Sequence, residues 1–116
     1  MRAFVFPGQG SQYIGMGKEL AETFSDAKEV FQEVDEALKQ DLFKLMTQGD
    51  EADLNLTENT QPALMAVSVA VARVLRKQSG KNTDELCNFV AGHSLGEYSA
   101  LTAAGAIDIA MTAKLL

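Results

Sequence analysis

The sequence contains few of the residues on which cross-linked and many catalytic proteins depend. Its 116 residues include one cysteine, one histidine, two prolines and no tryptophan. The single cysteine, Cys87, excludes a disulfide within the chain and is typical of a reducing compartment, so we expect a cytoplasmic protein. We expect Cys87 to pack as a small apolar side chain rather than to react.

Long apolar runs and an excess of positive charge are also absent. The longest apolar run, residues 62–72, is about half as long as a membrane-spanning helix and is interrupted by Ser68. The apolar run at residues 3–6 is too short for the core of a signal peptide. The formal net charge of −6 argues against nucleic acid as a partner. We therefore expect a globular protein that engages neither a membrane nor nucleic acid.

Apolar residues recur at two different spacings, which predict short strands and amphipathic helices. Residues 3–6 (AFVF) and residues 88–91 (NFVA) each precede a turn containing glycine and predict a short strand. The polar residues 77–84, which include Gly80, predict a loop. Helical spacing predicts helices at 25–38 with Ser25 as N-cap, at 41–47, from about 60 to 74, at 95–104 with a stop at Gly105, and onward from a cap at Asp108.

Strands separated by helices favour parallel pairing and an α/β layered fold. Two strands alone leave both sheet edges unpaired, and they cannot cover the apolar faces of these helices. We therefore expect the N-terminal part of a larger α/β domain, with a parallel sheet flanked by helices and incomplete at the C-terminus.

Residues 92–96, GHSLG, match the G-x-S-x-G pattern of a nucleophilic serine on a sharp strand-to-helix turn. The pattern alone is a moderate signal, since composition gives about 3 chance matches per hundred chains of this length. Its context strengthens it, because an apolar run precedes it and the helix-forming run EYSALTAA follows it. We expect this turn to lift the Ser94 hydroxyl clear of the sheet. The Leu95 N–H is then the first donor to a developing oxyanion.

Each residue type in this pattern has a physical reason. A tight reversal crowds the positions two before and two after the serine, where only Gly92 and Gly96 fit. The alternative is that Ser94 only caps the following helix, but a cap does not need both glycines. His93 is poorly placed to be the base because adjacent side chains diverge at such a turn. We expect a structural role for His93 and a catalytic base that is not in this chain.

The glycine-rich turn at residues 7–12 follows the first predicted strand, where α/β proteins bind ligands. Two nucleotide-binding patterns fail here: Tyr13 replaces the third glycine of the dinucleotide fingerprint, and Gln12 replaces the first glycine of a P-loop. If the two strands are neighbours, Gln9 shares a crevice with Ser94, and its backbone N–H is a candidate second oxyanion donor. The alternative is an ordinary strand-to-helix turn.

Three segments stand out in this order: FVFPGQGSQ at 4–12, TQPAL at 60–64 and GHSLGEYSAL at 92–101. Together they resemble the malonyl-CoA:acyl carrier protein transacylases of fatty-acid synthesis. Acyltransferase domains of polyketide and fatty-acid synthases share much of this pattern. The resemblance implies that Ser94 is the nucleophile and that Gln9 and the Leu95 N–H form the oxyanion hole. Gln61 matches a glutamine that lines the site, and we take it and His93 as candidates for the substrate pocket.

The resemblance also implies where the rest of the chemistry lies. Residues 1–116 correspond to the N-terminal portion of the large α/β-hydrolase-like subdomain, without the small inserted subdomain or the C-terminal part. The family's carboxylate-binding arginine and catalytic histidine are both missing, so we expect these residues alone to be inactive.

The implied reaction is ping-pong transfer of a malonyl group through a serine ester, from coenzyme A to the phosphopantetheine thiol of acyl carrier protein. No metal or cofactor is expected, because the coenzyme A thioester is a substrate. The alternatives are a serine thioesterase or other hydrolase with the same elbow, a polyketide synthase acyltransferase domain, and a non-catalytic binding module.

Overall fold

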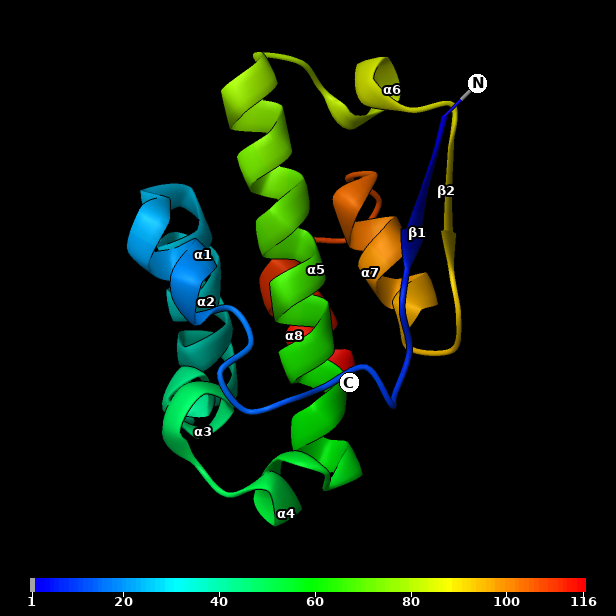
Figure 1. The fold of residues 1–116 in the computed structure, drawn as a ribbon. Helices are drawn as coiled ribbons and strands as arrows, with labels where there is room; N and C mark the ends of the chain where they lie inside the picture. The colour runs from blue at the N-terminus through cyan, green and yellow to red at the C-terminus, as the bar shows by residue number, and fades with distance from the viewer. Residues whose placement is uncertain (1) are drawn as a thin grey trace.

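The computed structural model describes residues 2–116. A small sheet lies at one side of the molecule, and the long helix α5 runs through its middle (Figure 1). Within these residues the strands are β1 (Ala3–Phe6) and β2 (Phe89–Gly92). The helices are α1 (Lys18–Thr23), α2 (Ser25–Leu38), α3 (Leu42–Gln48), α4 (Glu51–Leu54), α5 (Thr57–Ser79), α6 (Thr83–Leu86), α7 (Gly96–Ala103) and α8 (Ile109–Leu115).

The two strands pair in parallel, with Phe6 opposite Gly92. Both strands therefore end at the same edge of the sheet. Helix α7 lies between the strands and α5 and contacts all three (Figure 1). The predicted parallel pairing within an α/β fold is confirmed. It brings the segments that follow β1 and β2 together, which is where ligands bind in such sheets.

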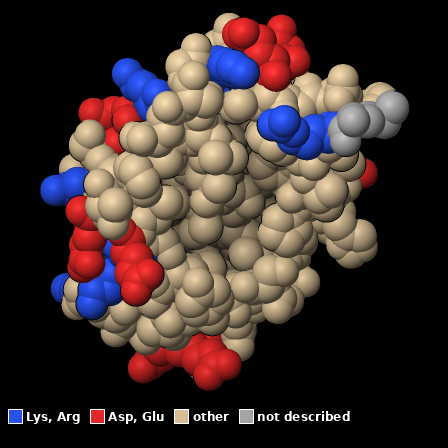
Figure 2. All heavy atoms as spheres, turned by 45° about the horizontal axis from the view of Figure 1, so that its top comes forward, with Lys and Arg blue, Asp and Glu red and all other residues tan. Residues whose placement is uncertain are grey.

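The outer edge of each strand is unpaired within residues 2–116. Val5 on β1 is 73% exposed and Phe89 on β2 is 57% exposed. A groove of about 410 Å³ lies between β1 and α5, and its lining residues, which include Val71 and Leu75, are all uncharged. Figure 2 shows a hollowed, uncharged centre with Lys, Arg, Asp and Glu around its rim. Apolar edges of this kind fit the expectation of a larger sheet.

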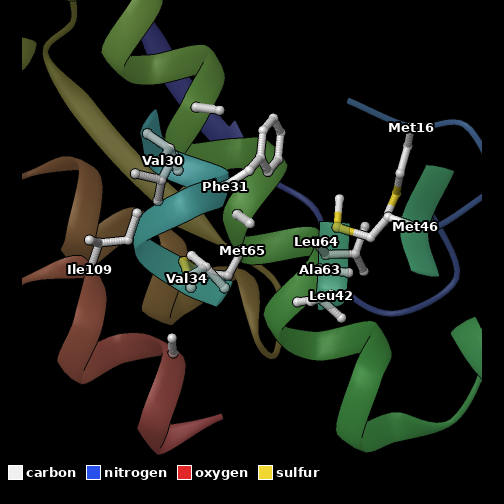
Figure 3. Close-up of a cluster of buried hydrophobic side chains, with 14 of the residues drawn as sticks. Met16, Val30, Phe31, Val34, Leu42, Met46, Ala63, Leu64, Met65 and Ile109 are labelled. Atoms are coloured by element: carbon white, nitrogen blue, oxygen red, sulfur yellow. The ribbon is translucent and has the colours of Figure 1, made fainter. Parts of the chain in front are cut away.

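The main core forms where α2, α5 and α8 meet (Figure 3). Helix α2 places Val30, Phe31 and Val34 on one face, and they pack with Met65 of α5 and Ile109 of α8. Burial of each such side chain contributes about 1.5–3 kcal/mol to stability. A second part of the same core is formed by Met16, Leu42, Met46, Ala63 and Leu64.

Two helix starts differ from the sequence prediction. Ser25 is not the N-cap of α2 but its first residue. The cap position falls on Phe24, because this single extended residue (φ −126°, ψ 121°) is the whole link between α1 and α2. Helix α5 begins at Thr57 rather than near Thr60, and Pro62 lies inside it.

Helix α5 is also longer than predicted at both ends. At its start the Asn59 side chain donates to the Asp53 carbonyl oxygen at 2.9 Å, and the Thr60 hydroxyl donates to that of Leu54. At its end it continues to Ser79, and Gly80 closes it with a φ of 70°. The loop predicted at 77–84 is therefore shorter than expected: residues 80–82 lie outside any helix, α5 includes residues 77–79 and α6 begins at Thr83.

Two other predicted helix boundaries are confirmed. The Asp108 carboxylate accepts the Met111 N–H at 2.8 Å as the N-cap of α8. Gly105 follows the end of α7 with a φ of 85°, in the left-handed region that glycine enters without strain. These caps were predictable because each depends on one residue type at one position.

The structure also shows where the single cysteine lies and how long and apolar the helices are. Cys87 is buried, and its thiol donates to the Thr83 carbonyl oxygen at 3.4 Å, so it packs as expected. None of the helices in residues 2–116 combines the length and hydrophobicity that crossing a bilayer requires.

Candidate active site

Ser94 lies on the short turn between the end of β2 at Gly92 and the start of α7 at Gly96. Its φ is 56°, so the backbone is left-handed at a residue that has a Cβ. Among residues 2–116 only Lys39 shares this conformation without being glycine. Such strain at a non-glycine residue is typical of functional sites, and Ser94 is exposed as the sequence predicts.

The glycines on either side of Ser94 are required by close backbone contacts. A Cβ added at Gly92 would lie 2.0 Å from the carbonyl oxygen of Gly96. A Cβ added at Gly96 would lie 2.2 Å from the carbonyl oxygen of Phe6. The predicted crowding at both positions is therefore confirmed. It also extends further than the motif indicates, because Gly96 packs against β1 as well as against its own turn.

The turn continues directly into α7. The Gly96 N–H donates to the His93 carbonyl oxygen at 2.9 Å, and the Glu97 N–H donates to that of Ser94 at 3.0 Å. Leu95 holds the N-cap position, and no side-chain hydrogen bond caps the helix. The alternative in which Ser94 is only a helix cap is therefore wrong. The Leu95 side chain is buried in the core, which anchors the turn.

The loop after β1 lies directly against the serine turn. The His93 N–H donates to the Phe6 carbonyl oxygen at 3.2 Å. A Cβ added at Gly8 would lie 2.6 Å from the His93 carbonyl oxygen and 3.1 Å from His93 Nδ1. Gly8 thus packs on the residue before Ser94, which brings the loop that carries Gln9 to the turn. The predicted adjacency of the two segments is confirmed.

The Gln9 side chain forms its hydrogen bond with the start of helix α5. Its Nε2 donates to the Thr57 hydroxyl at 3.4 Å, at the start of α5. The side-chain amide is therefore engaged with α5. The predicted contribution of Gln9 to an oxyanion hole rests on its backbone N–H.

Gln61 lies half-buried in α5, four residues after Thr57. Residues at this spacing share one face of a helix, so Gln61 is on the side of α5 that receives the Gln9 side chain. No hydrogen bond joins Gln61 to the serine turn among the described residues. His93 is exposed at the turn, where its backbone joins β1 and its ring meets Gly8.

Sequence reasoning missed one part of this site. The sequence pattern gives the Gln12 side chain no role of its own, yet that side chain accepts the Gly10 N–H in its own loop and donates to Asn55 before α5. The repeated amides of the GQGSQ segment were the available signal. Within residues 2–116 no three His, Cys, Asp or Glu side chains are grouped as metal ligands would be.

Comparison with known proteins gives a consistent result. The sequence profile described as "Acyl transferase domain" matches residues 3–116. The malonyl CoA-acyl carrier protein transacylase of Bacillus subtilis strain 168 is 56% identical over 106 residues, which are 91% of this chain and 32% of that protein. This chain therefore spans about a third of the length of such relatives.

Solved structures match the fold as well. The acyl-carrier-protein S-malonyltransferase from Bartonella henselae superimposes with a TM-score of 0.94 at 57% identity, covering 99% of this chain and 37% of that one. A malonyl-transacylase solved in complex with a type II polyketide synthase acyl carrier protein has a TM-score of 0.89 at 49% identity. It covers 97% of this chain and 35% of that one.

Proposed function

Because this chain belongs to the acyl transferase domain family, we propose that it is the N-terminal part of a malonyl-CoA:acyl carrier protein transacylase of fatty-acid synthesis. The observation that carries the proposal is the left-handed backbone conformation of Ser94. This exposed serine lies between Gly92 and Gly96 and beside the loop that contains Gly8 and Gln9. This geometry supports nucleophilic acyl transfer.

The proposed reaction has two half-reactions through one serine ester. The Ser94 oxygen attacks the malonyl thioester carbonyl, the carbon–sulfur bond breaks and coenzyme A leaves as the thiol. The phosphopantetheine thiol of the carrier then attacks the ester and regenerates the Ser94 hydroxyl. In both steps the carbonyl oxygen becomes an oxyanion, which the N–H groups of Leu95 and Gln9 stabilise. Gln61 and His93 line the substrate pocket.

The remaining groups belong to the two-thirds of the relatives' length that this chain does not span. The Ser94 proton needs a base, and the one histidine here is its own neighbour. We infer that a histidine and a carboxylate-binding arginine lie beyond Leu116, in the rest of the large subdomain, which also carries a small inserted subdomain. Residues 1–116 alone then do not turn over. The reaction itself requires no cofactor.

The partner and the compartment follow from the same proposal. The relative solved with a carrier protein supports acyl carrier protein as the second substrate. The free, buried Cys87 supports a reducing cytoplasm.

The test uses a complete polypeptide that carries residues 1–116. After incubation with malonyl-CoA, we expect a stable protein-bound malonyl ester that addition of carrier thiol discharges to malonyl-carrier. A thioesterase would instead release free malonate rapidly, without a carrier and without accumulating the ester. That outcome would replace the transacylase with a hydrolase.

A further inference from the structure

The Gln12 side chain connects two segments that are far apart in the sequence. The Gly10 N–H donates to Gln12 Oε1 at 2.7 Å, and Gln12 Nε2 donates to Asn55 Oδ1 at 2.9 Å. A backbone N–H only donates, so the oxygen end of the amide must face Gly10 and the nitrogen end must face Asn55. The two ends of one amide thus hold the loop and its neighbour together.

This bridge acts at the point where the loop reverses. Gly10 has a φ of 115°, and a Cβ placed there would have open space around it, so only the backbone conformation demands glycine. A glycine has no side chain with which to hold this conformation. The hydrogen bond from its N–H to Gln12 supplies that restraint.

The anchor of the bridge is itself well held. The Asn55 N–H donates to the Glu51 carbonyl oxygen at 2.9 Å at the end of α4. The preceding residue, Leu54, is fully buried, and its carbonyl oxygen accepts the hydroxyl of the equally buried Thr60. The corner between α4 and α5 is therefore tied to the core, and Gln12 ties the loop to that corner.

The loop is consequently held on two sides. Gly8 packs against His93 on the serine turn. Gln9 and Gln12 bind Thr57 and Asn55 at the α4–α5 corner. The backbone of Gln9 lies between these attachments, so its orientation depends on both.

We propose that Gln12 is a positioning residue, which through Gly10 and Asn55 holds the backbone N–H of Gln9 toward the acyl oxygen on Ser94. This inference rests on the proposed function. In this role Gln12 acts through the backbone of its own loop and not by contact with substrate. Removal of an oxyanion donor lowers kcat about 100–1,000-fold, so a donor that is present but poorly held should cost less, about 10–100-fold.

The test compares variants of the complete polypeptide. Gln12→Ala and Asn55→Ala should each lower kcat for malonyl transfer about 10–100-fold, with KM for malonyl-CoA changed less than about 3-fold. The double variant should be no worse than the more impaired single one, because both remove the same bridge. Asn55→Asp keeps an oxygen for Gln12 Nε2 and should restore most of the activity.

A matched control is available in the same chain. Gln40 Nε2 donates to Asn59 Oδ1 at 3.0 Å, another exposed amide–amide bond that reaches α5 but does not involve the loop. Gln40→Ala should leave kcat unchanged. If Gln12→Ala has no more effect on kcat than Gln40→Ala, the positioning role is wrong.

A structural readout separates this inference from the proposed function. In Gln12→Ala, hydrogen exchange of the Gly10 amide, followed by NMR, should become faster while Tm stays the same. Unchanged exchange would show that Gln12 does not restrain Gly10, which would overturn the inference whatever the activity. If the unsubstituted protein forms no malonyl ester, the proposed function is wrong. Gln12 then has no role in malonyl transfer. The exchange result then still shows whether the bridge exists.

Discussion

Gly96 at the start of α7 lies so close to Phe6 at the end of β1 that a Cβ on Gly96 would stand 2.2 Å from the Phe6 carbonyl oxygen. The serine turn is therefore built against the first strand. Gly96→Ala should force the two backbones apart and lower the free energy of unfolding by about 3 kcal/mol in urea denaturation.

Gly80→Ala provides the control for this change. Gly80 has a φ of 70° but nothing near its Cβ position, so the substitution adds conformational strain without a clash. It should cost about 1–2 kcal/mol. Equal losses at the two positions would contradict the contact between Gly96 and Phe6.

The core of α5 can be tested with two leucines of the same helix. Leu64 is 4% exposed in the core, whereas Leu75 is 43% exposed beside the open groove. In the 116-residue chain, Leu64→Ala should lower the free energy of unfolding by about 2–5 kcal/mol, and Leu75→Ala by less than about 1 kcal/mol. A loss at Leu75 as large as that at Leu64 would mean that the groove is filled.

Asp35 makes the folding stability of the chain depend on pH. Burial raises the pKa of its carboxyl group above the ordinary 3.8, the negative Asp41 raises it further, and hydrogen bonds from the backbone of Phe43 and Leu42 oppose the rise. Because the folded pKa is above the unfolded one, the neutral carboxyl group favours the folded state. This contribution of Asp35 to the free energy of unfolding is complete below about pH 3.8 and is lost as pH rises through the folded pKa.

Asp35→Asn should therefore make the protein more stable at pH 7 than the unsubstituted chain, with the difference disappearing below about pH 4. Asparagine keeps an oxygen for the Phe43 N–H, which Asp35 Oδ1 accepts at 3.1 Å. The measurement is Tm against pH. Glu29→Gln, which removes one charge from the exposed face of the same helix, should not reproduce the effect.

The open edge of β1 should make the 116-residue chain self-associate. Val5 is 73% exposed there, and a lysine on an edge strand opposes pairing with another chain. Val5→Lys should reduce the apparent mass in sedimentation velocity at high concentration. Gln32→Lys adds the same charge at an exposed position of α2, so an equal effect would point to net charge rather than to the edge of β1.

Features that depend on local residue type could be predicted from the sequence. The strand Ala3–Phe6 follows from a short apolar run before a Pro-Gly turn, and the Asp108 cap follows from one hydrogen bond. Gly92 follows from the crowding of its own turn, whereas the closest contact at Gly96 is with Phe6 of β1. The prediction of Ser25 as N-cap was wrong although serine is a good capping residue. Phe24 holds the cap position because it is the single residue between α1 and α2.

Features that depend on distant contacts were not readable in the same way. The hydrogen bond from Gln12 to Asn55 joins residues in separate segments, and the spacing of apolar residues gives no sign of it. Helix α1 has no buried residue, so it left no strong apolar pattern. The pairing of β1 with β2 was predicted from strand order, but the packing of Gly8 on His93 joins two segments far apart in the sequence and leaves no pattern in either.

The central claim is that the Ser94 hydroxyl is the group that becomes acylated. The most direct measurement is peptide mapping by mass spectrometry of a complete polypeptide carrying residues 1–116, quenched in acid after incubation with malonyl-CoA. We predict one malonyl group, on the peptide that contains Ser94, absent in Ser94→Ala and retained in Ser25→Ala. A malonyl group that persists in Ser94→Ala, or that maps to another residue, would contradict the account.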